Sequence, residues 1–540
     1  KINSRRIDIK ELTTVLKGME PVDEQVDNLR LNLKFLSSAK SITESPNLPI
    51  GEFFITNLYG KMKHYPHVLH DFHADIFVED RDFKVLDFSG MIDKSDFHFS
   101  GKLKNYNLWF DEKMQGDTRV EFDLTSSLLQ FDNLFTYGGE KFVPEDYRHE
   151  EVSNLKIHGT TDLHFNNGLK STDFKLTELK GKLKVHPLSL ENFKGRCHLE
   201  DGQLTVQNFS GKMGHSLFNI NLDYALEKNQ SKIPNKLRIE GSRLDLDELM
   251  NYNQSPSLNS STSKPVEHDA VFSIYDFDFQ KFKLDIDVKQ LNYHNYKLTN
   301  FFTVIRTEKN HMIHVDKLDF NAAGGHFDIT GYLSGKDKEH IYFKPIIKVR
   351  NLDLDKFMIK FDNFGQDHLV SENLHGTFNG EITGKIHLHA DLVPKIDDSE
   401  LNIDMSVLNG KLENYGPLLA LGEYFEEGKL KQVYFDTLTN VFTLQKSKLT
   451  IPTMTINSSL GFLEITGSQR IDGPMDMDYL IGVPWKLITQ VAGKKLFGRK
   501  SKDQESENEI QYRQENSKFL YVRMKGNLED YSVSISKKPK

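Results

Sequence analysis

At 540 residues the chain is long enough for several ordinary domains, and its hydrophobic content of 38% is too high for a disordered chain. Its net charge of -9, with both signs interspersed, excludes a basic nucleic-acid footprint over the chain as a whole. The single cysteine, Cys197, excludes an intramolecular disulfide and a zinc site made from several cysteines.

The first fifty residues are the least strand-like part of the sequence. The stretch from Ile7 to Leu36 predicts one or two helices, so we treat residues 1–50 as a partly helical N-terminal segment. No apolar run approaches the roughly 18 residues of a membrane span. The chain begins Lys1-Ile2-Asn3 without Met, which is typical of a fragment, and a signal or anchor upstream is compatible with it.

From Phe53 onward the dominant hydrophobic period is two. Phe282–Val288, Ile386–Ala390 and Leu401–Met405 alternate apolar and polar residues, as strands with one buried and one wet face do. We therefore predict a β-repeat region over residues 51–250 and a second β region over residues 270–540. Between them, residues 251–269 are polar and rich in Ser, which predicts a flexible linker or loop.

A short pattern recurs along these β regions. Leu318–Gly331 and Met454–Gly467 align without a gap, with Asn, Gly, Ile, Thr and Gly in register, and looser copies lie at Leu86–Gly101 and Phe209–Leu222. Each copy reads as strand, tight turn, strand. Repetition of such a unit favours a mainly β fold: an elongated, curved antiparallel repeat sheet that forms a groove, with a few short helices.

A second recurring element follows some strand pairs. Leu244–Leu249 and Leu352–Phe357 are near copies, and Phe122–Leu128 is a looser third. We interpret each as a strand end that runs into a short helix, with the N-terminus capped by Asp247, Asp355 and Thr125 respectively. The alternative is that the acidic residues are catalytic carboxylates, but repetition in a structural unit favours capping.

Two helices are expected in the last third of the chain. Pro417–Glu427 has Pro near its first turn and Gly428 after its last. Pro484–Arg499 is basic and amphipathic, which is typical of a helix on an anionic membrane surface but also of one that covers the end of a sheet. Its apolar side gives the candidate membrane or lipid contacts, namely Trp485, Ile488, Val491 and Leu496.

Histidines at three-residue spacing, namely His64, His67, His70 and His73, would suit a metal on a helix. The flanking sequence favours a strand instead, where residues three apart point to opposite faces, so we predict no metal site. His387 and His389 share one strand face and are expected to be exposed.

The remaining signals for catalysis are weak. Cys197 and His198 are neighbours on a predicted strand and would point to opposite faces, which excludes a nucleophile–base pair. The sequence contains no GxSxG, HExxH, P-loop or strand-linked GxGxxG motif. We therefore expect no enzyme activity and no cofactor.

Several segments of the last half, taken in order, resemble the C-terminal region of the AsmA-like family of bacterial envelope proteins, which is similar to TamB-type proteins. These segments are Asn321–Gly331, Leu352–Asp355, Leu408–Leu412, Leu418–Phe425, Leu430–Phe442, Asn457–Gly467 and Val522–Tyr531. The resemblance covers roughly Leu284 to Ile535, whereas the first half is similar in texture only.

The resemblance implies a long curved β-sheet with an apolar groove that spans part of the Gram-negative periplasm. It also implies transfer of phospholipid between the inner and outer membranes, with an N-terminal inner-membrane anchor that this chain lacks and no catalytic residues. The expected partners are phospholipid, a membrane surface and other envelope proteins, without nucleic acid.

The alternating strands support the same expectation, because a large uncovered apolar face calls for a ligand or a partner. One alternative is an assembly factor for outer-membrane proteins that templates strands along its sheet edges. Another is a glycan-acting β-solenoid enzyme, which needs clustered carboxylates where the sequence has scattered acids.

Overall fold

The computed structural model divides the chain into two compact units, Lys1–Ser261 with Asn292–His294, and Thr262–Leu291 with Asn295–Lys540. The structure describes residues 1–540 except 12–22, 45–48, 110–114, 132–135, 138–139, 142–148, 167–168, 185–187, 227–233, 251–272, 277–278, 294–295, 361–372, 391, 393, 415–418, 420–421, 423–426, 472–475, 486–488, 490–508, 513–516, 528–529 and 538–540.

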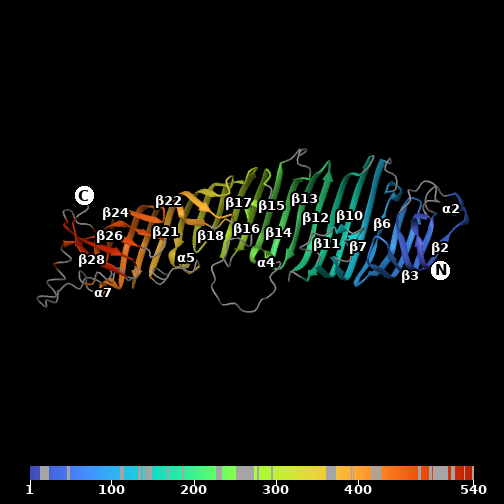
Figure 1. The fold of residues 1–540 in the computed structure, drawn as a ribbon, viewed down its shortest axis with the longest axis horizontal. Helices are drawn as coiled ribbons and strands as arrows, with labels where there is room; N and C mark the ends of the chain where they lie inside the picture. The colour runs from blue at the N-terminus through green and yellow to red at the C-terminus, as the bar shows by residue number, and fades with distance from the viewer. Residues whose placement is uncertain are drawn as a thin grey trace. The chain divides into compact units, whose positions relative to one another are not determined.

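The first unit is an antiparallel sheet in which each described strand pairs with the next along the chain (Figure 1). Its strands are β1 (Ile2–Asp8), β2 (Gln25–Ser37), β3 (Gly51–Met62), β4 (Val68–Glu79), β5 (Asp82–Ile92), β6 (Ser95–Leu103), β7 (Gln115–Gln130), β10 (Glu151–Asn166), β11 (Leu169–Leu183), β12 (Ser189–Glu200), β13 (Gln203–Met213), β14 (Ser216–Ala225) and β15 (Asn235–Asp245). The short strands β8 (Thr136–Tyr137) and β9 (Glu140–Lys141) pair separately.

The second unit repeats this arrangement, and from β17 to β28 each strand pairs antiparallel with the next. Its strands are β16 (Phe282–Tyr293), β17 (Tyr296–Glu308), β18 (Met312–Ala322), β19 (Gly325–Ser334), β20 (Tyr342–Asp353), β21 (Leu374–Leu388), β22 (Pro394–Glu413), β23 (Gln432–Gln445), β24 (Lys448–Ser458), β25 (Gly461–Arg470), β26 (Met477–Pro484), β27 (Phe519–Gly526) and β28 (Tyr531–Ser536).

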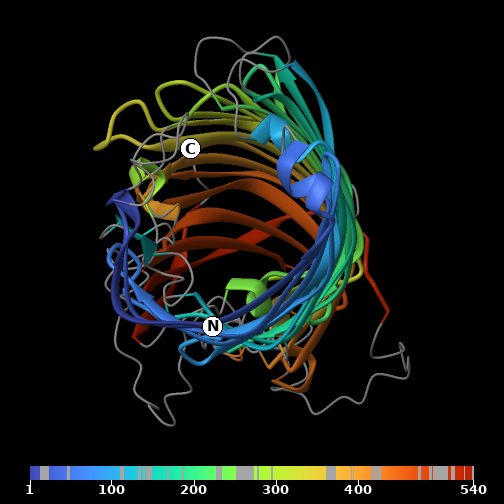
Figure 2. The same ribbon diagram turned by 90° about the vertical axis from the view of Figure 1, so that its right-hand side faces the viewer.

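Helices in the described residues are few and short. They are α2 (Ala39–Glu44), η1 (Tyr106–Trp109), α4 (Leu246–Met250), η3 (Ile274–Asp276), α5 (Leu354–Lys360) and α7 (Glu427–Leu430). Strands of both units are visibly bent, and the sheet is not closed (Figure 2). The predicted fold class, a mainly β, curved antiparallel sheet that forms a groove, is confirmed.

The repeated sequence pattern marks β-hairpins. Leu318–Gly331 forms the β18–β19 hairpin and Met454–Gly467 forms the β24–β25 hairpin, in matching register: Asn321 lies opposite His326, and Asn457 lies opposite Phe462. The looser copies form the β5–β6 and β13–β14 hairpins.

The final glycine of the pattern has a steric role. A Cβ at Gly331 would lie 2.4 Å from the carbonyl oxygen of Lys344, and one at Gly467 would lie 2.4 Å from that of Asp478. The next strand therefore approaches too closely for any side chain, which accounts for Gly at this place in both copies.

β-bulges recur in the middle of the strands, and sequence periodicity did not reveal them. Register shifts coincide with Asn or Asp residues in the left-handed region, for example Asn192 (φ 56°), Asn208 (φ 52°) and Asn351 (φ 53°). Each bulge adds one residue, so apolar residues on one face become three apart, as Val206 and Phe209 are. A bulge also bends its strand and increases the local twist, which contributes to the curvature of the sheet.

The predicted capping residues of α4 and α5 were wrong, because the residue that caps each helix lies two positions earlier. In α4 the backbone N–H of Glu248 donates to Asp245, and in α5 that of Lys356 donates to Asp353, at 3.2 and 3.1 Å. Each helix therefore begins after the first Asp of its pattern, and Asp247 and Asp355 lie within the first turn. No helix begins at Thr125, because β7 continues through it in pairing with β10.

Two further helix predictions need correction. Within the predicted helical stretch from Ile7 to Leu36, residues 9–11 are helical, whereas residues 25–37 form β2, because their alternating Leu and Phe side chains pair with β3. The described helix α2 follows at Ala39–Glu44. Most of the predicted helix Pro417–Glu427 lies outside the described residues. Gly428 lies inside α7 rather than after a helix.

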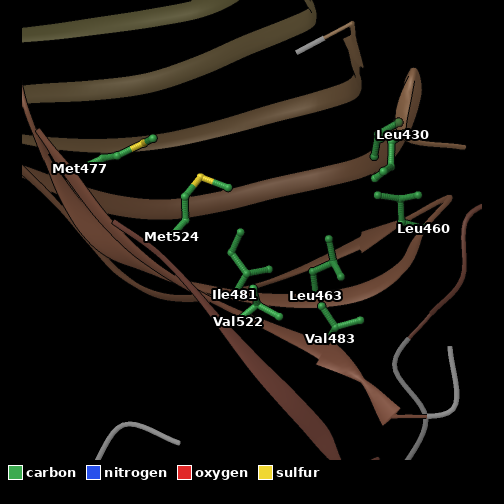
Figure 3. Packing of buried hydrophobic residues seen from close by; sticks show 9 residues of the cluster. Leu430, Leu460, Leu463, Met477, Ile481, Val483, Val522 and Met524 are labelled. Carbon is green, nitrogen blue, oxygen red and sulfur yellow. The ribbon is translucent and has the colours of Figure 1, made fainter. Parts of the chain in front are cut away.

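Fully buried apolar residues occur along both units, and some of them form clusters. The largest cluster among the described residues lies toward the end of the second unit, and Figure 3 shows its side chains gathered beside the strands. Leu430 of α7 and Val483 and Val522 of the strands are each 0% exposed there. Smaller clusters lie near strand ends, one around Leu129 and Val152 and others beside η3 and α5. These clusters supply the conventional core of the fold.

The left-handed bulges give a test of this architecture. Asn351→Val should lower the local unfolding free energy by about 1–2 kcal/mol, because a β-branched residue is strained at positive φ. Asn351→Gly should change it by less than about 1 kcal/mol, since glycine adopts this conformation freely. Hydrogen exchange of amides in β20 and β21 measures both values; equal effects of the two substitutions would contradict the assignment.

Candidate functional site

One face of the first unit's sheet carries continuous rows of apolar side chains. Cross-strand pairing places residues of neighbouring strands directly opposite one another on the same face. One such row crosses β5, β6, β7, β10 and β11 through Phe88, Phe99, Leu124, Ile157 and Leu179. Another crosses β11 to β15 through Phe174, Cys197, Val206, Leu222 and Leu237. We call the face that bears these rows, in each unit, the apolar face.

The second unit has the same arrangement. A row crosses β19 to β23 through Ile329, Ile347, Ile382, Ile403 and Phe442. Every residue in these three rows is half-buried, neither fully covered nor fully exposed. The middle of the apolar face therefore differs from the buried clusters described above.

Exposure indicates which side of the bent sheet the apolar face occupies. Apolar residues that point to the opposite, polar face are well exposed, with Leu217 at 47%, Ile346 at 44% and Val441 at 44%. Their neighbours Ile347 and Phe442, on the apolar face, are only half-buried. Side chains crowd on the inner side of a bend and spread on the outer side, so this difference favours the inner side for the apolar face.

The polar face is covered by charged residues that pair across strands. His158 lies 2.5 Å from Asp123 across β7 and β10, and Arg306 lies 2.5 Å from Asp316 across β17 and β18. Such exposed pairs contribute little stability individually. The charged side chains keep this face in contact with water, so the apolar side chains of each strand lie on the other face.

Only one of the predicted membrane contacts lies within the described residues. Trp485 follows directly after β26, is 51% exposed, and its backbone N–H donates to the carbonyl oxygen of Lys518 at 2.8 Å. Ile488, Val491 and Leu496 lie outside the described residues.

The N-terminal histidines meet carboxylates rather than each other. His67 lies 2.6 Å from Asp93, whose backbone carbonyl also accepts a hydrogen bond from His70 at 2.9 Å. A bulge at Asp71 (φ 55°) brings His70 and His73 to one face, which corrects the expectation that residues three apart point oppositely. Within the described part of the chain, no group of three or more His, Cys, Asp or Glu is placed to hold a metal.

Cys197 and His198 point to opposite faces, as predicted. Cys197 belongs to an apolar row, and burial raises the pKa of its thiol, which keeps it neutral. His198 lies 2.8 Å from Asp173 on the polar face. His387 and His389 are both half-buried rather than exposed, and His389 lies after the end of β21. Burial lowers the pKa of the His387 imidazole.

No protein-family model, curated protein or solved structure matches this chain. Among the helices of the described residues, none has the length and apolar character needed to cross a membrane.

Two features of this site were not predicted from the sequence. One is the set of mid-strand bulges that keep apolar residues on one face; the available signal was an Asn or Asp between apolar residues spaced by three. The other is the pairing of histidines with carboxylates across strands, since cross-strand neighbours are set by register, which the sequence does not state.

The His198–Asp173 contact predicts a pH effect. The hydrogen bond to Asp173 raises the pKa of His198, so Asp173→Asn should lower it. A raised folded-state pKa stabilises the fold below the unfolded-state value of about 6.5, and that contribution disappears as pH rises through the folded-state pKa. The substitution should therefore lower the melting temperature more at about pH 6 than at about pH 8.5. NMR titration of His198 checks the shift; an unchanged pKa would refute the contact.

Proposed function

We propose that this chain holds phospholipid acyl chains along its apolar face and acts in lipid transfer or envelope biogenesis. The observation that supports this is the set of half-buried apolar rows, exemplified by Ile347, Ile382 and Ile403. Such rows are costly to leave in water, and acyl chains match them in chemistry.

The energetics favour retention of lipid combined with mobility along the sheet. Each acyl CH₂ removed from water contributes about 0.8 kcal/mol, so a whole tail is held firmly. Where successive strands present equivalent apolar rows, a tail that moves by one strand exchanges one set of contacts for a similar set. The net change in free energy for such a step is then small, and the proposal needs neither a cofactor nor a catalytic residue.

The proposed setting is the periplasm, with transfer between inner and outer membranes and a membrane anchor outside this chain. This part of the proposal derives from the AsmA-like resemblance of the segments between Leu284 and Ile535. The same resemblance makes other envelope proteins the expected partners.

Charge placed on the apolar face tests the proposal. Ile382→Asp combined with Ile403→Asp should lower the co-purified phospholipid several-fold, because a carboxylate there disfavours acyl chains. The matched control, Thr383→Asp with Asn402→Asp, alters adjacent residues on the polar face and should leave the lipid unchanged. Mass spectrometry of organic extracts measures phospholipid per chain.

Two outcomes of that experiment would count against lipid binding. Equal loss in both double variants would point to general destabilisation. Clean absence of phospholipid from the unsubstituted, folded chain would mean that the apolar face serves another purpose, and templating of outer-membrane protein strands would then be preferred.

Trp485 provides a separate test of membrane contact. The chain has only two tryptophans, so Trp109→Phe leaves Trp485 as the sole indole fluorophore. Addition of anionic phospholipid vesicles should shift its emission to shorter wavelength, because the exposed indole would enter the interfacial region. An unchanged spectrum, with vesicle binding verified by co-sedimentation, would remove Trp485 from the contact surface.

A further inference from the structure

A depression of about 530 Å³ lies where β11, β12 and β13 lose regular pairing. The register shifts between Leu176 and Leu179 on one side of β12, and between Lys194 and Arg196 on the other. These two irregularities flank the same short part of β12, so the sheet is locally open there.

Most side chains around this depression are basic or polar, and Leu176 and Gly195 complete its lining. Lys175, Lys194 and Arg196 line it together with neutral hydrogen-bonding residues that include Gln207 and Ser210. None of its described lining residues is Asp or Glu. The three cations are exposed, and Lys175 and Arg196 belong to the polar face because their chain neighbours Phe174 and Cys197 belong to an apolar row.

The carboxylates nearest along these strands are already paired with other cations. Glu178 lies 2.9 Å from Lys156, and Asp173 lies 2.8 Å from His198. Glu191 lies 3.0 Å from Lys212. Among the described residues, none forms an ion pair with Lys175, Lys194 or Arg196.

Lys175 and Arg196 also lie directly opposite each other across β11 and β12. Like charges in that relation destabilise a sheet. A bound anion would remove the repulsion and add charge-assisted hydrogen bonds. The two like charges therefore destabilise the fold when no anion is bound, and a bound anion would remove this destabilisation.

We propose that this depression, which we call the basic depression, binds a phosphate group. Arg presents a planar fork of donors that matches two phosphate oxygens, whereas Lys supplies a point charge. Three cations suit the charge of about -1.5 to -2 on a phosphomonoester at neutral pH. The volume of about 530 Å³ leaves room for a substituent on the phosphate, such as glycerol.

The basic depression is distinct from the proposed acyl-chain face, because its charged side chains project from the opposite side of the sheet. Its ligand is either a small phosphorylated metabolite or the headgroup of an anionic phospholipid in a membrane. Both sources present the same phosphate chemistry to the three cations, and the test separates them.

The test compares two triple variants of equal net charge. K175Q/K194Q/R196Q removes the basic depression's cations. K156Q/K180Q/K212Q removes cations of β10, β11 and β13 that are paired with Glu178 and Glu191. Each is titrated calorimetrically with glycerol 3-phosphate, with acetate at equal ionic strength as the reference anion. Co-sedimentation with phosphatidylglycerol vesicles is compared with phosphatidylcholine vesicles.

The first variant should bind at least about tenfold more weakly than the unsubstituted chain, since charged hydrogen bonds are lost. The second should stay within about twofold, because exposed ion pairs contribute little. Binding of glycerol 3-phosphate identifies a free phosphorylated ligand, and binding of phosphatidylglycerol vesicles alone identifies a headgroup.

Absence of both, or equal weakening in the two variants, would overturn the basic depression as a phosphate site. Circular dichroism verifies that both variants fold. Phospholipid content of the K175Q/K194Q/R196Q extract should match the unsubstituted chain, so failure here is separable from failure of the acyl-chain proposal.

Discussion

The structure depends on the sorting of apolar side chains to one face of an antiparallel sheet over many strands. A shift of one residue in any strand would reverse its two faces, yet the apolar rows remain continuous from Phe88 to Leu179 and from Ile329 to Phe442. The bulges at left-handed Asn and Asp residues allow this, because each bends a strand and inserts one residue without moving the next apolar residue to the wrong face. One of these bulges, at Asn208 (φ 52°), also lies at the basic depression, on its β13 side.

The sorted face is covered unevenly. Aliphatic residues close it toward the end of the second unit, where Val483 and Val522 have no exposed surface. Short helices such as α5 and η3 close it near strand ends. Between these places the rows are half-buried, with their outer surface available to an apolar ligand. A conventional buried core would require a second layer of structure over these rows. The helices in the described residues are too short to form such a layer.

Much of this architecture could be predicted from the sequence, since alternation in segments such as Phe282–Val288 and the matched glycines Gly331 and Gly467 follow from local sterics. The predicted helix starts were misplaced by two residues, because each Leu-Asp-Leu-Asp pattern contains two Asp residues that could cap the helix. The first Asp is the cap in both helices, and its backbone N–H is bonded to the previous hairpin. An apolar face was expected from the alternation of apolar and polar residues. Which residues form each row, and which cations meet at the basic depression, depends on register across strands, which is fixed only in the folded sheet.

Site-specific photo-crosslinking in cells tests the central claim most directly. A benzophenone-bearing amino acid in place of Phe174 or Phe442 should give phospholipid adducts detectable by mass spectrometry, because both side chains lie on the apolar face. The same amino acid in place of Asp123 or Asp404, on the polar face, should not. Adducts of equal yield at all four positions, or none at Phe174 and Phe442, would contradict the account.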